Sequence, residues 1–319
     1  MITRPGPPEV LQLREVPDPT AGAGEVLVQV HATALNRADL LQRRGHYPAP
    51  PGVPADIPGL EVAGEVVRCG PGATRFAPGS RVMALLGGGG YAEQVVVSEG
   101  HLMPIPETLS WEQAAGIPEA FLTAFDALVL QAHLTRGEVA LIHSAASGIG
   151  TAAAQVARAR GARVLGLARS AEKRSWLMTQ GWFEAVFDPA EMETRDAVRG
   201  ADVILDLVGA AAWPLYLEVL APRGRVVVLS TMTGSRIELP LDRLMTARAQ
   251  VLGSVLRPRS TAEKSELVAA FVAELLPLFR VGTLQPVIDR VLDWTQAAEA
   301  HSVMEANQSK GKLILTIGT

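Results

Sequence analysis

Residues 142–157 read Ile-His-Ser-Ala-Ala-Ser-Gly-Ile-Gly-Thr-Ala-Ala-Ala-Gln-Val-Ala, which predicts an apolar strand, a tight turn of small residues and an amphipathic helix. Small residues at Ala145, Ser147, Gly148 and Gly150 let the backbone pass close to a pyrophosphate. The free amides and the dipole of the first helical turn favour its negative charge. The segment therefore predicts a dinucleotide-binding turn in the middle of the chain.

This turn is a degenerate form of the glycine-rich dinucleotide motif, because Ala145 and Ser147 stand where the first two glycines are expected. Its context favours a nucleotide site over an ordinary strand-to-helix turn. A strand predicted at 139–143 precedes it, a helix predicted at 149–160 follows, and a second strand is predicted at 164–168. The residues expected to face the cofactor are Ala146, Ser147, Gly148, Ile149 and Gly150.

The end of the second predicted strand indicates which dinucleotide binds. NAD-binding units usually place an Asp or Glu there for the ribose hydroxyls, and such an acid would repel a 2′-phosphate. This chain instead has Arg169 and Ser170, with Lys173 one turn further on, and these side chains suit a phosphate. We therefore expect NADPH rather than NADH, the alternative being that Arg169 and Lys173 are solvated surface charges.

The pattern of predicted elements changes along the chain. Residues 1 to about 110 carry short alternating strands among Gly and Pro, as in a mostly-β domain with long loops. Strands alternating with helices then predict a doubly wound parallel sheet, with the strands at 139–143, 164–168, 185–187, 203–207, 225–229 and 251–256. A helix at 264–279, a helix near 295–307 and a last strand at 312–317 follow, and this strand is expected to return to the first domain. The predicted domains are 1–115 with 260–319, and 116–259.

The composition of the chain argues against several classes of protein and of metal site. The net charge of −4 argues against a nucleic-acid surface, and no segment resembles a transmembrane helix or a signal peptide, so a cytoplasmic protein is expected. A single cysteine, Cys69, leaves no internal disulfide and no cysteine-built metal site. The histidines show no metal-ligand spacing and are interpreted as loop and surface imidazoles. Residues 2–6 resemble the end of a first strand, so the natural start is expected a few residues upstream.

Several segments besides the nucleotide turn carry a family resemblance: Ala34–Tyr47, Pro58–Gly64, Ala114–Ala124, Ser254–Arg257 and Met304–Asn307. Over nearly its whole length the chain resembles the zinc-independent, NADPH:quinone oxidoreductase branch of the medium-chain dehydrogenase/reductase superfamily. It is most similar to the subgroup typified by the animal quinone oxidoreductase that a tumour suppressor induces. The resemblance implies an α/β protein with a GroES-like, mostly-β catalytic domain and a Rossmann domain.

The departures from zinc-dependent relatives concern the metal. Those enzymes hold catalytic zinc with a Cys where this chain has Asn36 and with a His where it has Leu60. The resemblance therefore implies chemistry without zinc, on an acceptor that needs little activation. A quinone or an enone fits, because hydride transfer to either one delocalises the developing negative charge onto an oxygen.

The resemblance also implies roles for individual residues. It places Asn36 beside the reacting face, Tyr47 in the substrate cleft and Thr123 close to the nicotinamide. Asn36 is alternatively a cap of the helix predicted at 37–42, and Tyr47 alternatively packs its ring against neighbouring prolines. Further cofactor contacts are implied for Val208, Gly209, Ser230, Thr231, Leu256, Arg257 and Asn307.

Two acids stand near this expected site. Relatives often have an Asn-Tyr pair after the third strand of the nucleotide domain, near the adenosine phosphate, whereas this chain has Asp188-Pro189. An acid there argues against strict selection of NADPH. Asp206 lies within an apolar strand, and we interpret it as a structural carboxylate bound by neighbouring amides rather than as a catalytic acid.

Three functions fit these patterns. The first is NADPH-dependent quinone reduction, and the second is reduction of an enone or enoyl thioester, for which Arg43 and Arg44 are candidate contacts to a carrier. The third is non-catalytic NADPH binding, as in crystallin-like relatives. The apolar strand predicted within 249–256 would lie at a sheet edge, so a homodimer is expected.

Overall fold

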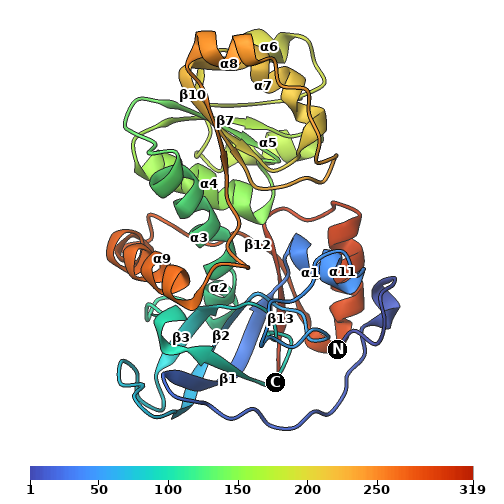
Figure 1. Ribbon diagram of the computed structural model, residues 1–319, viewed down its shortest axis with the longest axis vertical. Coiled ribbons are helices and arrows are strands. Elements are labelled where there is room, and N and C mark those ends of the chain that lie inside the picture. The colour runs from blue at the N-terminus through green and yellow to red at the C-terminus, as the bar shows by residue number, and fades with distance from the viewer. Residues whose placement is uncertain (319) are drawn as a thin grey trace. The chain divides into compact units, whose positions relative to one another are not determined.

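The computed structural model describes residues 1–318 and divides into two compact units (Figure 1). The first unit comprises Met1–Leu122 with Leu256–Thr319, and the second comprises Thr123–Val255. The predicted domain limits at 115/116 and 259/260 lie a few residues from these divisions and remain predictions. No helix within residues 1–318 combines the length and the apolar character needed to cross a bilayer.

The second unit contains a six-stranded sheet in which every observed pairing is parallel, with the order β11-β10-β9-β6-β7-β8. This is the doubly wound order of a dinucleotide-binding fold. Its strands are β6 (Val139–His143), β7 (Arg163–Leu167), β8 (Ala185–Phe187), β9 (Ala201–Asp206), β10 (Leu220–Val228) and β11 (Gln250–Gly253). Its helices are α4 (Gly148–Ala159), α5 (Ala171–Thr179), α6 (Glu193–Ala197), α7 (Trp213–Val219) and α8 (Leu241–Ala247).

The central strands of this sheet are apolar runs because helices cover them. Leu141, Ile204 and Val226 are at most 1% exposed and share one core with Trp213 and Tyr216 of α7. Such continuous apolar strands are typical of parallel sheets buried on both faces. The doubly wound part of the predicted fold class is therefore confirmed.

The first unit is built on a mostly antiparallel sheet of order β12-β13-β1-β2-β3-β5, with β4 also paired to β1. Its strands are β1 (Glu25–Ala34), β2 (Glu61–Cys69), β3 (Arg81–Leu85), β4 (Gln94–Ser98), β5 (Leu102–Pro104), β12 (Ile288–Asp293) and β13 (Lys312–Thr316). Its helices are α1 (Arg37–Arg43), α2 (Trp111–Ala115), α9 (Thr261–Glu274), α10 (Leu276–Arg280) and α11 (Ala297–Glu305), while α3 (Pro118–Phe125) crosses the division. The predicted return of the last strand is confirmed, because β13, red in Figure 1, pairs with the blue β1.

Two predicted elements end differently in the structure. The strand predicted at 251–256 stops at Gly253, where its pairing with Val228 ends, so Leu256 and Arg257 lie in the following turn rather than on a strand. The helix predicted at 264–279 is two helices, α9 and α10, with Pro277 in the first turn of α10. Proline lacks the amide that a continuous helix would need there, but it fits a first turn.

Candidate functional site

The nucleotide turn connects β6 to α4 through a close backbone approach. The Ser147 hydroxyl caps α4 by accepting a hydrogen bond from the Gly150 amide at 3.0 Å. A Cβ at Gly150 would lie 2.5 Å from the carbonyl oxygen of Ser144 and 2.7 Å from that of Ala145. Only glycine lets the helix start this close to the strand, and turns that bind a diphosphate typically have such a glycine.

Most of the predicted cofactor residues follow the carboxyl ends of neighbouring parallel strands. Ala146 to Gly150 follow β6, Arg169 and Ser170 follow β7, Val208 and Gly209 follow β9, and Ser230 and Thr231 follow β10. Ligands of open α/β sheets bind at this edge.

The loops after β9 and β10 pack closely together. The Thr233 amide donates to the Val208 carbonyl at 2.9 Å. Gly209 has a φ of 95°, and a Cβ there would lie 2.9 Å from the Thr231 Cα. The two loops thus pack directly against each other, and β9 pairs with β6, the strand that leads into the nucleotide turn.

A buried network of hydrogen bonds lies at the carboxyl ends of β9 and β6. Asp206 is 0% exposed, and its Oδ1 accepts from the Val208 amide at 2.9 Å and the Gly209 amide at 2.8 Å. The Tyr216 hydroxyl also donates to this oxygen at 3.1 Å and lies 2.7 Å from Nδ1 of His143. The expected binding of Asp206 by neighbouring amides is confirmed for Oδ1, whereas Oδ2 is buried with no hydrogen-bond partner among the described residues. A purely structural role for this carboxylate remains a prediction.

Three histidines are not the surface or loop imidazoles that the sequence suggested. His143 and His301 are 7% and 0% exposed, and His101 is 9% exposed. Burial lowers the pKa of His143 to about 4 and that of His301 to about 3, so both are neutral near pH 7. His301 lies 3.1 Å from an Arg43 nitrogen and 3.2 Å from the Tyr91 hydroxyl, so it completes a buried polar network. Single histidines have no sequence pattern that marks them as buried.

The residues expected near a 2′-phosphate lie at the start of α5. Arg169 and Ser170 are exposed, and Ser170 caps α5 through the Lys173 amide at 3.4 Å. One residue that the sequence did not reveal joins them: Arg174, whose guanidinium donates to Asp188 at 2.7 Å. Asp188, the acid that follows β8, therefore forms an ion pair with Arg174.

Asn36 lies between β1 and α1 in the first unit and is only 9% exposed. Its Nδ2 donates to Glu61 at 2.8 Å, and its Oδ1 accepts from Lys312 Nζ at 2.7 Å. Asn36 is also the N-cap residue of α1, and Asp39 in the first turn of this helix accepts from the Asn36 backbone amide at 2.7 Å. The side-chain amide of Asn36 is thus bound through its nitrogen to Glu61 and through its oxygen to Lys312. These two residues form a buried ion pair at 2.6 Å.

Tyr47 is partly buried, and Arg257 covers it. The Arg257 guanidinium carbon lies 4.8 Å from the Tyr47 ring centroid, a cation–π contact. Its nitrogens also donate to the Tyr47 carbonyl at 3.2 Å, the Gly87 carbonyl at 2.7 Å and the Gln42 side chain at 2.6 Å. Arg257 therefore holds the Tyr47 loop in place.

These contacts do not support the cofactor role expected for Arg257, which remains a prediction. The same holds for Leu256, which is buried at 3% exposure, and for the exposed Asn307, which accepts from Arg37 at 2.7 Å. All three lie in the first unit rather than in the nucleotide-binding unit. Thr123 is 7% exposed on α3, and its expected role also remains a prediction.

Glu119 is a further candidate that the sequence did not reveal. Its amide donates to Glu61 at 2.8 Å at the start of α3. Burial, and then the Glu61 carboxylate, raise the pKa of Glu119 to about 8. Its ionised form would interact electrostatically with Tyr47 and Arg257. An acid in the first turn of a helix usually interacts with the helix dipole, so no sequence pattern marked Glu119 as a carboxyl with a raised pKa.

Replacing Glu119 by glutamine is expected to stabilise the fold at alkaline pH. The folded protein keeps a proton up to about pH 8 that the unfolded chain releases near its ordinary value of 4.5. Stability therefore falls between these pH values, and the glutamine variant avoids this loss. We expect its free energy of unfolding to exceed that of the wild type by at least ~1 kcal/mol near pH 8, since one pKa unit is worth about 1.4 kcal/mol.

Urea unfolding at about pH 4 and about pH 8 measures this difference. The gain should be small at the acidic value, because both states then hold the proton for most of the time. A gain of the same size at both pH values would contradict the assignment of a raised pKa to Glu119.

Among residues 1–318, no three or more His, Cys, Asp and Glu side chains are grouped so that they could hold a metal ion.

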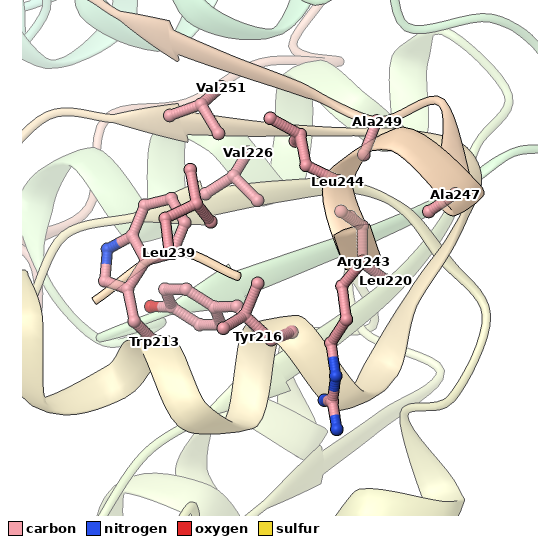
Figure 2. A pocket seen from close by; sticks show the side chains of 11 residues that line it. Trp213, Tyr216, Leu220, Val226, Leu239, Arg243, Leu244, Ala247, Ala249 and Val251 are labelled. Atoms are coloured by element: carbon pink, nitrogen blue, oxygen red, sulfur yellow. The ribbon is translucent and has the colours of Figure 1, made fainter. Parts of the chain in front are cut away.

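Figure 2 shows an apolar pocket in the second unit, between α7, β10 and α8, lined by Trp213, Tyr216, Leu244 and Val251 among others. Its cavity is small, at about 30 Å³.

Comparisons with known proteins agree with this architecture. Residues 22–107 match the family model of the alcohol dehydrogenase GroES-like domain, and residues 148–273 match that of the zinc-binding dehydrogenases. The quinone oxidoreductase of Sus scrofa is 34% identical over 98% of this chain and 95% of its own length.

Solved structures of similar proteins share this two-unit architecture. An NAD-dependent alcohol dehydrogenase is 31% identical with a TM-score of 0.87, covering 99% of this chain and 98% of its own. A mycobacterial protein solved with NADPH is 26% identical with a TM-score of 0.88, again covering 99% and 98%. These similarities extend through both units of the fold.

Proposed function

The chain is an oxidoreductase of the medium-chain dehydrogenase/reductase family, and we propose that it reduces quinones by hydride transfer from NADPH without zinc. The observation that carries this proposal is the state of the positions where zinc-dependent relatives hold their metal. Asn36 has both ends of its amide bound to Glu61 and Lys312, and Leu60 is an apolar side chain at 1% exposure. Neither side chain is a zinc ligand, although one matching family model is that of the zinc-binding dehydrogenases.

The nucleotide unit has the features that NADPH would need. The glycine-dependent turn at Gly150 and the joined loops after β9 and β10 fit a diphosphate and a nicotinamide. Arg169, Ser170 and Lys173 would hold the 2′-phosphate. When bound, NADPH supplies the hydride, and the backbone of residues 146–150 orients its diphosphate.

Tyr47 and Glu119 are the groups that we propose to act on the acceptor oxygen. Reduction of a quinone to a hydroquinone requires a proton in addition to each hydride and places negative charge on an oxygen. Burial raises the pKa of Tyr47, so its hydroxyl stays protonated and would donate a hydrogen bond to that oxygen. Glu119, protonated up to about pH 8, would add no negative charge near the oxygen on which negative charge develops.

The loss of NADPH absorbance with a panel of acceptors tests the proposed reaction. The panel contains ortho-quinones, para-quinones, a simple enone and a crotonyl thioester, each measured also with NADH. Rapid turnover of quinones with NADPH and a silent thioester would support the proposal. Faster turnover of the thioester or the enone would assign the chain to the second candidate function, and tight NADPH binding without turnover would assign it to the third.

A homodimer formed through the nucleotide unit is also proposed. The strand β11 forms one edge of the sheet, and apolar side chains near it are exposed, with Val251 at 42% and Val255 at 50%. Leu241 and Met245 of α8 are exposed at 65% and 75%. An unpaired apolar edge of this kind favours pairing with a second copy. Sedimentation at micromolar concentration should show a dimer, and a monomer alone would contradict it.

A further inference from the structure

The guanidinium of Arg174 joins the ends of two neighbouring strands of the nucleotide unit. Arg174 lies on α5, and its Nη1 donates to the carbonyl of Ala168 at 3.0 Å and to that of Arg169 at 2.7 Å. The same nitrogen donates to Asp188 Oδ2 at 2.7 Å. Ala168 and Arg169 follow β7, and Asp188 follows β8, so one side chain connects both loops.

Asp188 stands where it would oppose a phosphate on the adenosine ribose. Strands β7 and β8 pair to their ends, with Leu167 opposite Phe187, and the Ala168 amide donates to the Phe187 carbonyl at 3.0 Å. The carboxylate of Asp188 thus follows the strand next to the one that leads into Arg169 and Ser170. An unpaired carboxylate beside a 2′-phosphate would repel it, as the acid of NAD-binding units does.

The ion pair with Arg174 removes this repulsion, because the guanidinium neutralises the negative charge of Asp188. Both side chains are only about one-fifth exposed, at 21% and 18%, so solvent screens the pair less than an exposed one. Asp188 is also fixed on its other oxygen, because Oδ1 accepts from the Ala190 amide at 3.0 Å. The carboxylate therefore points at the guanidinium, and the charges of the two groups cancel at this site.

We propose that Arg174 is a specificity-determining residue that allows NADPH to bind despite Asp188. It neutralises the carboxylate, and its hydrogen bonds to the carbonyls of Ala168 and Arg169 hold the guanidinium beside Asp188. An arginine suits both tasks, because it keeps its charge at any pH of interest and donates in several directions. This inference rests on the proposed use of NADPH and specifies how the chain achieves it.

Dissociation constants of NADPH and NADH, measured from the fluorescence of the bound dinucleotide without any acceptor, test the inference. Arg174→Leu exposes the Asp188 charge, and we expect it to raise the Kd of NADPH about tenfold or more and that of NADH about threefold or less. In the Asp188→Asn background the same substitution should change the NADPH/NADH ratio by less than about twofold, because the charge to be neutralised is gone.

A matched control lies at the other end of the same two strands. Arg163 at the start of β7 pairs with Glu184 at 2.7 Å before β8, and this pair is exposed. Arg163→Leu removes an equivalent ion pair far along the strands from Arg169, so it should leave the NADPH/NADH ratio of dissociation constants unchanged. If Arg174→Leu fails to fold, Arg174→Lys keeps the charge and should retain a preference for NADPH.

The outcomes separate the inference from the proposal on which it rests. A wild type that prefers NADPH, with an Arg174→Leu variant that weakens both dinucleotides equally, would overturn the inference alone. Loss of NADPH preference in Arg174→Leu that persists unchanged in the Asp188→Asn background would also overturn it. A wild type that binds NADH as tightly as NADPH would overturn both the inference and the proposed cofactor preference.

Discussion

Lys312→Met should destabilise the protein by about 3–5 kcal/mol, the range measured when one partner of a buried ion pair is removed. Lys312 is 4% exposed and Glu61 is 0% exposed, so the substitution leaves a carboxylate inside the protein without its cation. Nζ of Lys312 also donates to the Leu35 carbonyl at 3.0 Å and to Asn36 at 2.7 Å, and both acceptors lose that donor. Urea unfolding near pH 7 measures the loss.

A second variant tests whether the unpaired charge causes this effect. Lys312→Met combined with Glu61→Gln removes the carboxylate as well, and we expect it to recover part of the lost stability. A single Lys312→Met variant as stable as the wild type would contradict the buried ion pair. A double variant less stable than the single one would show that lost packing, rather than lost charge pairing, dominates.

Gly150→Val should raise the Kd of NADPH by at least about tenfold, which corresponds to 1.4 kcal/mol. Its Cβ would lie 2.5 Å from the Ser144 carbonyl oxygen and 2.7 Å from that of Ala145, so the first turn of α4 must move away from β6. The amides that face the diphosphate then lose their alignment. Fluorescence titration with NADPH measures the change, and circular dichroism checks that the variant is folded.

Gly253→Ala is the matched control, because a Cβ there meets nothing within 4 Å and the residue has no positive φ. It should bind NADPH as the wild type does. A Gly150→Val variant with unchanged affinity would contradict the assignment of this turn to the diphosphate.

Local patterns in the sequence predicted the nucleotide unit well. The strand at 139–143, the turn and the following helix were recognisable because their apolar periodicity and small residues are contiguous. The end of β11 was misplaced, because the apolar run to Leu256 continues after the pairing with β10 stops at Gly253. Burial after that point depends on other segments of the chain, which periodicity cannot show.

The side-chain partners within the site were less predictable. Glu61 and Lys312 are 251 residues apart, and no local pattern links them. Arg174 and Asp188 are 14 residues apart on different elements, so the acid appeared unpaired in the sequence. Asn36 was recognised by family resemblance, but the engagement of its amide on both sides depends on the fold.

The measurement that tests the central proposal most directly is the oxidation of NADPH by an ortho-quinone with protein dialysed against a strong chelator. NADPH carrying deuterium in place of the transferred hydrogen is compared with ordinary NADPH in the same assay. We predict that activity survives chelation and that the deuterated cofactor reacts more slowly, because the C–H bond breaks in the hydride step. Loss of activity on chelation with recovery on adding zinc, or no consumption of NADPH with any quinone, would contradict the proposal.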